Sequence, residues 1–209
     1  MLIKTLPVGM LETNCYIVTD EATKKCAIID PGADSNTILD YIEANSLQPE
    51  AIFITHGHFD HCMALEAVKE GIDVPVYINE NDVDRVDQEN RYKYDGRLDV
   101  KNYVDGDTIN IGNMEFYILG TPGHSPGSVT IKCEDAVFTG DTLFSGDCGR
   151  TDLPGSCRET MLKSLKRLAD LEGNFEVYPG HDESTTLDNE RTFNRDMLEA
   201  IGFSTSFLK

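Results

Sequence analysis

Basic side chains are scarce in this sequence: 18 lysines and arginines stand against 37 aspartates and glutamates, for a formal net charge of −19. Such an excess of negative charge repels both the phosphate backbone of a nucleic acid and an anionic membrane face. We therefore expect a small-molecule partner, with no nucleic acid and no membrane. A local cluster of basic residues could still hold a small anion.

Long apolar runs and paired cysteines are also missing. No stretch approaches the length needed to span a bilayer, and the first ten residues lack a basic region followed by an apolar one. The six cysteines include no Cys-x-x-Cys pair, and a chain of 209 residues does not need disulfides to fold. The sequence thus favours a soluble, cytoplasmic protein with reduced thiols, and it gives no indication of the oligomeric state.

No internal repeat or flexible linker divides the chain, so one domain over residues 1–209 is expected. Strands are predicted at 14–19, 26–29, 51–54, 74–78, 108–111, 114–119, 128–133, 136–139 and 175–178. Helices are predicted at 35–45, 62–69, 158–171 and 187–200. Several consecutive strands have connections of hairpin length, which argues against a doubly wound parallel sheet. The pattern predicts an α+β fold in which two packed sheets have helices outside.

The charge-rich segment 79–99 predicts a solvated surface helix and loop. The alternative is a lid that presents Tyr92, or the basic residues Arg91, Lys93 and Arg97, to a substrate.

Three histidines and an aspartate fall within six residues, at His56, His58, Asp60 and His61. They follow a predicted strand and precede a predicted helix, so that their side chains can converge on one small volume. Imidazole suits zinc and iron, carboxylate widens the choice toward manganese, and the cluster offers more donors than one tetrahedral site needs. A pair of divalent metal ions is therefore expected.

The two remaining histidines, His124 and His181, each follow a strand in a Pro-Gly-His turn, and Asp141 lies in a third turn after a strand. The glycine before each histidine allows a close approach of the backbone. One such histidine alone is usually a surface or hydrogen-bonding residue. Together with the first cluster, these turns can complete two coordination spheres. The candidate metal ligands are His56, His58, Asp60, His61, His124, Asp141 and His181.

This order of motifs resembles that of the metallo-β-lactamase superfamily of hydrolases, over nearly the whole chain. The resemblance implies an αββα sandwich of two mixed sheets flanked by helices, with two metals at one edge of the sheets. The implied ligands are His56, His58 and His124 for one metal and Asp60, His61 and His181 for the other, with Asp141 bridging.

Within the superfamily, segment 141–152 is similar to the one that follows the bridging aspartate in glyoxalase II and its short bacterial relatives. Zinc β-lactamases usually place cysteine where Asp141 stands. Two features differ from full-length glyoxalase II. The sequence ends nine residues after Ala200, where that enzyme adds a helical domain with glutathione contacts. Cys62, Met63 and Asp182 also stand where small residues are common.

The resemblance implies that a hydroxide bridging the metals hydrolyses a thioester such as an S-hydroxyacylglutathione, because metal binding lowers the pKa of water to about 7. Asp60 and Asp141 are the predicted catalytic residues. Zinc is the first expectation, and iron or manganese would suit the same donors. Arg150 and Tyr92 are candidate substrate contacts, and Asp30 is predicted to be a structural hydrogen-bond acceptor.

Other functions stay open on the sequence alone. A mononuclear iron persulfide dioxygenase would use the positions of His56, His58 and His124 with one aspartate. A lactonase or phosphodiesterase could use the same scaffold, since the net charge argues against a nuclease but not against hydrolysis of a small cyclic ester. A purely structural metal site is disfavoured, because such sites are closed and rich in cysteine.

Overall fold

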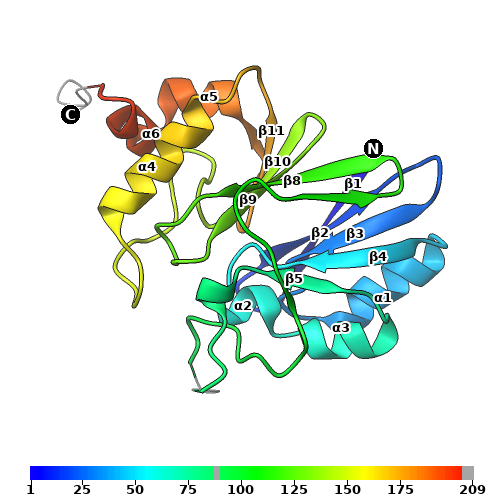
Figure 1. Cartoon of the computed structure of the whole chain (residues 1–209). Coiled ribbons are helices and arrows are strands. Elements are labelled where there is room, and N and C mark those ends of the chain that lie inside the picture. The colour runs from blue at the N-terminus through cyan, green and yellow to red at the C-terminus, as the bar shows by residue number, and fades with distance from the viewer. Residues whose placement is uncertain (87–89, 204–209) are drawn as a thin grey trace.

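The protein folds into two six-stranded sheets that pack face to face, with helices on both outer faces (Figure 1). The structure is a computed structural model that describes residues 1–86 and 90–203. Each sheet contains both parallel and antiparallel pairs. The expected αββα sandwich of two mixed sheets is thus confirmed.

The first sheet has the strand order β1-β2-β3-β4-β5-β6, antiparallel from β1 to β3 and parallel from β3 to β6. Its strands are β1 (Leu2–Val8), β2 (Thr13–Thr19), β3 (Lys25–Ile29), β4 (Gln48–Phe53), β5 (Val76–Ile78) and β6 (Lys101–Asn102). Parallel neighbours require crossover connections. These crossovers contain the helices α1 (Ser35–Ala44), α2 (Phe59–Cys62) and α3 (Leu65–Gly71).

The second sheet has the order β12-β11-β10-β9-β8-β7, and β10 and β11 form its parallel pair. Its strands are β7 (Thr108–Ile111), β8 (Met114–Gly120), β9 (Val129–Cys133), β10 (Ala136–Gly140), β11 (Glu176–Pro179) and β12 (Thr185–Thr186). Its outer face is covered by the helices α4 (Arg158–Ala169), α5 (Leu187–Phe193) and α6 (Arg195–Ala200).

Buried side chains form three apolar layers, because successive residues of a strand point to opposite faces of a sheet. In β2, Tyr16 and Val18 point into the layer between the sheets, while Cys15 and Ile17 pack under the helices. All six cysteines are unpaired. No helix in the described ranges is long and apolar enough to cross a bilayer.

Three helix predictions differ from the structure: two predicted helices are each divided into two, and the surface helix predicted in segment 79–99 is not formed in the described residues. The helix predicted at 62–69 is divided into α2 and α3, and the one predicted at 187–200 is divided into α5 and α6 at Asn194. In segment 79–99, the described residues contain only the short 3-10 helix η1 (Glu80–Asp82) and loop. Residues 87–89 of that segment lie outside the described residues.

Candidate metal centre

Strand direction brings the candidate ligands to one edge of the sandwich. In the first sheet, β3 and β4 run parallel. In the second sheet, β8 and β10 are both antiparallel to β9, and β11 is parallel to β10. The strands β8, β10 and β11 therefore share one direction. The candidate ligands lie in the loops after β4, β8, β10 and β11 and in helix α2, which follows the loop after β4. Hydrogen bonds join the two sheets here, from Val129 N to Thr55 O at 3.0 Å and from Asn14 N to Gly180 O at 2.7 Å.

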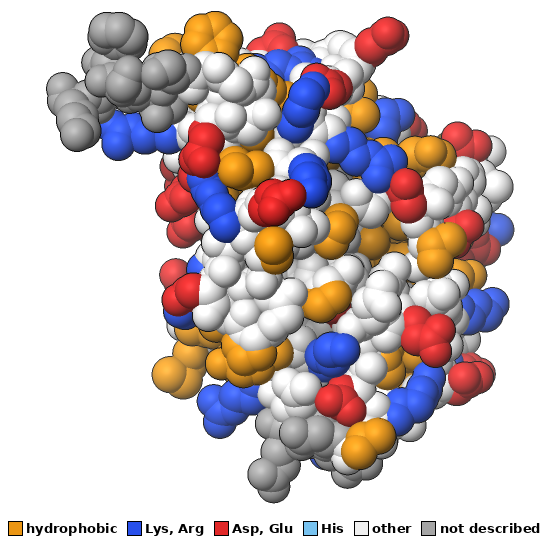
Figure 2. All heavy atoms as spheres, turned by 60° about the vertical axis from the view of Figure 1, so that its left-hand side comes forward, with side chains coloured by type: hydrophobic (Ala, Val, Ile, Leu, Met, Phe, Trp, Pro, Cys, Tyr) orange, Lys and Arg blue, Asp and Glu red, His pale blue; other side chains and the backbone are white. Residues whose placement is uncertain are grey.

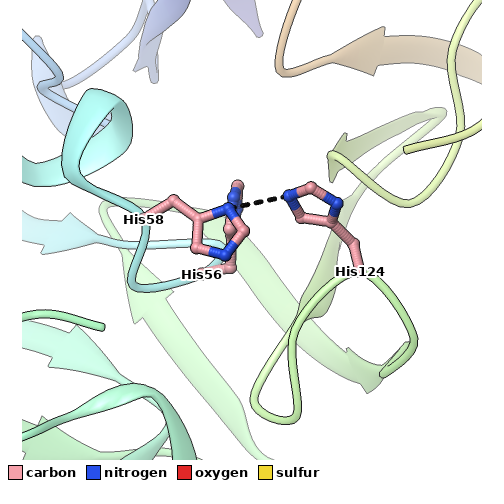
Figure 3. Close-up of side chains that lie close together, drawn as sticks. All are labelled: His56, His58 and His124. Atoms are coloured by element: carbon pink, nitrogen blue, oxygen red, sulfur yellow. Dashed lines mark hydrogen bonds between the residues drawn. The ribbon is translucent and has the colours of Figure 1, made fainter. Parts of the chain in front are cut away.

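The first group of side chains consists of His56, His58 and His124 (Figure 3). All three are buried, and each offers a ligand atom within 4.8 Å of the other two. His124 reaches across from the loop after β8, and its Nε2 lies 2.8 Å from Nδ1 of His58. One nitrogen from each of the three histidines could bind the same metal ion.

The second group consists of Asp60, His61 and His181, whose ligand atoms also lie within 4.8 Å of one another. Oδ2 of Asp60 is 3.3 Å from Nε2 of His181 and 3.5 Å from Nε2 of His61. This group offers two nitrogens and one carboxylate for a second ion.

Asp141 lies between the two groups. Its Oδ1 is 3.3 Å from Nε2 of His61, and its Oδ2 is 3.4 Å from Nε2 of His124. A Cβ on Gly180 would lie 2.3 Å from Oδ1 of Asp141, so glycine is required before His181 for the close approach that the sequence predicted. The structure therefore brings all seven predicted ligands together, and metal binding by them stays a prediction.

Unsatisfied polar atoms show that the donor set fits a metal. Among the described residues, four buried side-chain atoms have no hydrogen-bond partner: His56 Nε2, His58 Nε2, His61 Nε2 and Asp141 Oδ1. Buried polar atoms in proteins almost always have a partner, and all four of these belong to the candidate ligands. Divalent cations bound among them would satisfy these atoms.

Hydrogen bonds outside the centre orient three of the histidines. Nδ1 of His61 lies 2.9 Å from Oδ2 of Asp30, Nδ1 of His124 lies 2.9 Å from the carbonyl of Arg150, and Nδ1 of His181 lies 3.1 Å from the carbonyl of Leu11. A proton donated from Nδ1 leaves Nε2 free to bind a metal. Asp30 also accepts from Thr55 N and Oγ1, at 2.7 and 2.6 Å, as expected for a structural acceptor.

The electrostatics of the two groups differ. Burial, with His61 and His58 nearby, holds the pKa of His56 well below its usual value, and burial beside His124 lowers the pKa of His58 to about 4. Neutral imidazole is the form that binds metals. Burial disfavours the charged form of His61 too, but Asp141 and Asp30 raise its pKa well above the usual value. The second group thus attracts positive charge.

Asp82 is a buried residue at the centre that the sequence did not indicate. Its Oδ2 accepts from Gly57 N at 3.0 Å and from Ser125 Oγ at 2.5 Å, and its Oδ1 accepts from Gly127 N at 2.7 Å. It thereby joins the loop of His56 and His58 to the loop of His124. Asp82 lies in the acidic segment 79–99, where no local signal distinguishes it from its exposed neighbours.

A cleft of about 290 Å³ opens onto the centre and is lined by His58, Asp60, His124 and Asp141. The two predicted substrate contacts also line this metal cleft. The ring of Tyr92 is 5.7 Å from that of His58, and the exposed guanidinium of Arg150 is paired with Asp152 at 2.7 and 2.8 Å. Their contact with a substrate stays a prediction.

Comparison with known proteins identifies the family. The family model described as "Metallo-beta-lactamase superfamily" matches residues 8–181. The "Probable metallo-hydrolase YqgX" of Bacillus subtilis is 37% identical over 210 residues, covering 91% of this chain and 95% of its own. The "Hydroxyacylglutathione hydrolase GloC" of Haemophilus influenzae is 32% identical over 207 residues, covering 93% and 97%.

Solved structures agree with this match. The BLEG-1 B3 metallo-β-lactamase superposes with a TM-score of 0.84 at 31% identity, over 94% of this chain and 99% of its own. TTHA1623, solved in a di-iron-bound form, superposes with a TM-score of 0.79 at 34% identity, over 93% and 99%.

Proposed function

Because the chain belongs to the metallo-β-lactamase superfamily, whose members are generally metal-dependent hydrolases, we propose that it hydrolyses a thioester. The observation that carries this proposal is the pair of ligand groups on either side of Asp141, at the floor of an open cleft. The similarity to a protein named hydroxyacylglutathione hydrolase supports S-hydroxyacylglutathiones as the first substrates to test.

Two divalent ions would be held by the two groups described above, with Asp141 lying between the groups. When bound, such ions lower the pKa of water and polarise a carbonyl oxygen. Zinc is the first candidate because His and Asp are common zinc ligands. Iron suits the same donors, and the di-iron-bound form of TTHA1623 supports that alternative.

In the proposed reaction, water adds to the thioester carbonyl carbon and the C–S bond breaks, which yields a carboxylate, a thiol and one proton. Asp60 lines the metal cleft, and its proposed role is to orient the attacking water. Thr13 Oγ1 donates to Oδ2 of Asp60 at 3.4 Å and so helps to hold this carboxylate. Tyr92 and Arg150 line the same cleft, and their proposed role is to contact the rest of the substrate.

Metal analysis of the purified protein, paired with a substrate panel, tests the proposal. The panel contains S-lactoylglutathione, other thioesters, a lactone, a phosphodiester and glutathione persulfide. We expect about two metal ions per chain and hydrolysis of at least one thioester. One iron per chain with oxygen uptake on the persulfide would overturn the proposal, and so would hydrolysis confined to the lactone or the phosphodiester.

The variant Asp141→Asn distinguishes a metal centre that catalyses the reaction from one that only stabilises the fold. It keeps the shape of the side chain but removes the charge that lies between the two ligand groups. We expect hydrolysis to fall by at least about a hundredfold, because stabilisation by metals contributes several kcal/mol. The metal-loaded variant should keep its fold, as measured by circular dichroism. Loss of stability with retained turnover would indicate a structural site.

A further inference from the structure

A second cleft, of about 280 Å³, lies beside the metal cleft, between the β1–β2 turn, segment 32–33 and α2. Its lining is apolar, and within the described chain Asp60 is the only charged side chain that contributes to it. We call this cleft the apolar groove. Its large apolar side chains are Val8, Met10, Leu11, Phe59 and Met63.

The apolar groove is continuous with the metal cleft, since Leu11, Phe59 and Asp60 line both. Of the ten large apolar residues exposed in the described chain, four line the groove: Met10, Leu11, Phe59 and Met63. Apolar side chains that gather on a surface commonly mark a binding site. Figure 2 shows one face of the molecule, on which hydrophobic side chains are interspersed with charged ones.

The wall of the apolar groove is fixed to the metal centre. In the β1–β2 turn, Gly9 N donates to Oδ2 of Asp34 at 2.8 Å, and Glu12 N donates to the carbonyl of Gly9 at 3.3 Å. The carbonyl of Leu11 in the same turn lies 3.1 Å from Nδ1 of the candidate ligand His181. A molecule in the groove would therefore meet a preformed surface that ends at Asp60.

Charge decides which part of a thioester suits the groove. A larger cleft of about 590 Å³ adjoins the groove, with which it shares Phe59 and Met63, and is lined by Arg91, Lys93 and Arg97 together with Glu66 and Asp95. The common biological thiol carriers are charged and polar, so they suit that cleft or the rim near Arg150. A groove without a cation suits an uncharged hydrocarbon chain.

We propose that the apolar groove binds the acyl group of the substrate, and that this acyl group is an apolar chain of several carbons. The proposal rests on the proposed thioester hydrolysis and refines its substrate class. Fully burying a methylene contributes about 0.8 kcal/mol, or roughly fourfold in affinity. Longer acyl chains should therefore react more efficiently until the groove is filled.

Binding can be tested without turnover, because the chain has six methionines and only Met10 and Met63 line the groove. The zinc-loaded protein is labelled with 13C at the methionine methyl groups and titrated with octanoate. Met10→Leu and Met63→Leu assign the two signals. We expect these two to shift saturably, while the signals of the buried Met114, Met161 and Met197 do not. Acetate, which has the same carboxylate, should cause neither shift.

Several results would overturn the groove as an acyl site. One is the absence of any shift of the two signals, and another is an equal shift with acetate. A third is a shift that depends on protein concentration alone, because it would indicate that a second copy of the chain covers the groove. Because this experiment measures binding, it decides the matter even if no thioester is hydrolysed.

Steady-state kinetics provide a second test, in which the acetyl, butyryl, hexanoyl and octanoyl thioesters of the same thiol are compared as substrates. We expect kcat/KM to rise by about fourfold per added methylene, and Leu11→Ser to flatten this rise. Phe193→Ser removes a comparably exposed apolar side chain from α5, outside the groove, and should leave the rise unchanged. A flat profile with retained hydrolysis would overturn the groove alone, whereas absence of all thioester hydrolysis would overturn the proposed function.

Discussion

A single buried carboxylate, that of Asp82, positions the two loops that carry His56, His58 and His124. Burial raises the pKa of Asp82, and the hydrogen bonds from Ser125, Gly57 and Gly127 oppose that rise by stabilising the charged form. Asparagine has nearly the same shape but offers one carbonyl oxygen in place of two. At least one of the three donors would then face an amide NH2 group.

The variant Asp82→Asn should weaken metal binding by the first ligand group by about 10- to 100-fold, which is the usual effect of losing a contact that orients ligands. Competition with a chromogenic chelator measures both binding steps. The second group, which has no hydrogen bond to Asp82, should bind its metal nearly as before. Glu80→Gln is the matched control, since it removes an exposed negative charge from the same short helix.

Unchanged affinity in Asp82→Asn would contradict this positioning role. Equal weakening of both binding steps, with a lower urea midpoint in chelator, would instead indicate general destabilisation of the fold.

The predictability of these residues from the sequence depends on how local their signals are. Most of the ligands were predictable because His56, His58, Asp60 and His61 fall within six residues, and because the other two histidines each lie in a Pro-Gly-His turn. The role of Asp82 was not predicted, because it depends on N–H groups that lie 25 and 45 residues away in the sequence. Only the folded chain brings those donors to it.

At the scale of elements, apolar strands were predicted best. β4 ends in the buried residues Ala51, Ile52 and Phe53, and this apolar run predicts a strand from the sequence alone. β1 was missed because it is an edge strand with mostly exposed or half-buried residues that include Lys4 and Pro7, so its pattern is weak. Its strand conformation comes from pairing with β2 along its whole length.

The break between α5 and α6 also arises from tertiary contacts. Asn194 has extended φ and ψ of −73° and 117°, and its side chain caps α6 by accepting from Asp196 N and Met197 N. The amide of the same side chain donates to the carbonyl of Asp147 and to Oε2 of Glu190. Glu190 Oε2 also accepts from Gly146 N at 2.8 Å. Asn194 therefore anchors the segment that follows Asp141.

We expect Asn194→Ala to lower the free energy of unfolding by about 2 kcal/mol or more. Loss of a helix cap accounts for about 1 kcal/mol, and the part-buried carbonyl of Asp147 loses a donor as well. Urea unfolding monitored by circular dichroism measures the change. Asn36→Ala, at an exposed position of α1, is the control and should change stability by less than about 0.5 kcal/mol. Equal effects of the two substitutions would contradict the anchoring role of Asn194.

At the scale of the whole molecule, the two sheets are also joined away from the metal centre, through Asp20. This residue lies in the β2–β3 turn of the first sheet, and its Oδ2 accepts from Asn113 N and Nδ2 in the β7–β8 turn of the second, at 2.9 and 2.8 Å. Thr23 Oγ1 donates to the same oxygen at 2.7 Å. These hydrogen bonds, of which that from Thr23 has the largest effect, lower the pKa of Asp20 to about 2.

Because the pKa of Asp20 is lower in the folded protein than its ordinary value of 3.8, the folded state favours the charged carboxylate. Its contribution to stability is complete above about pH 5 and is lost as the pH falls toward 2. Asp20→Asn should therefore lower the urea midpoint at pH 7, and the difference from the unmodified protein should shrink between pH 5 and pH 3. Asp40→Asn, at an exposed position of α1, should show no such trend. A deficit in Asp20→Asn that stays constant from pH 7 to pH 3 would show that the charge of Asp20 does not contribute to joining the sheets.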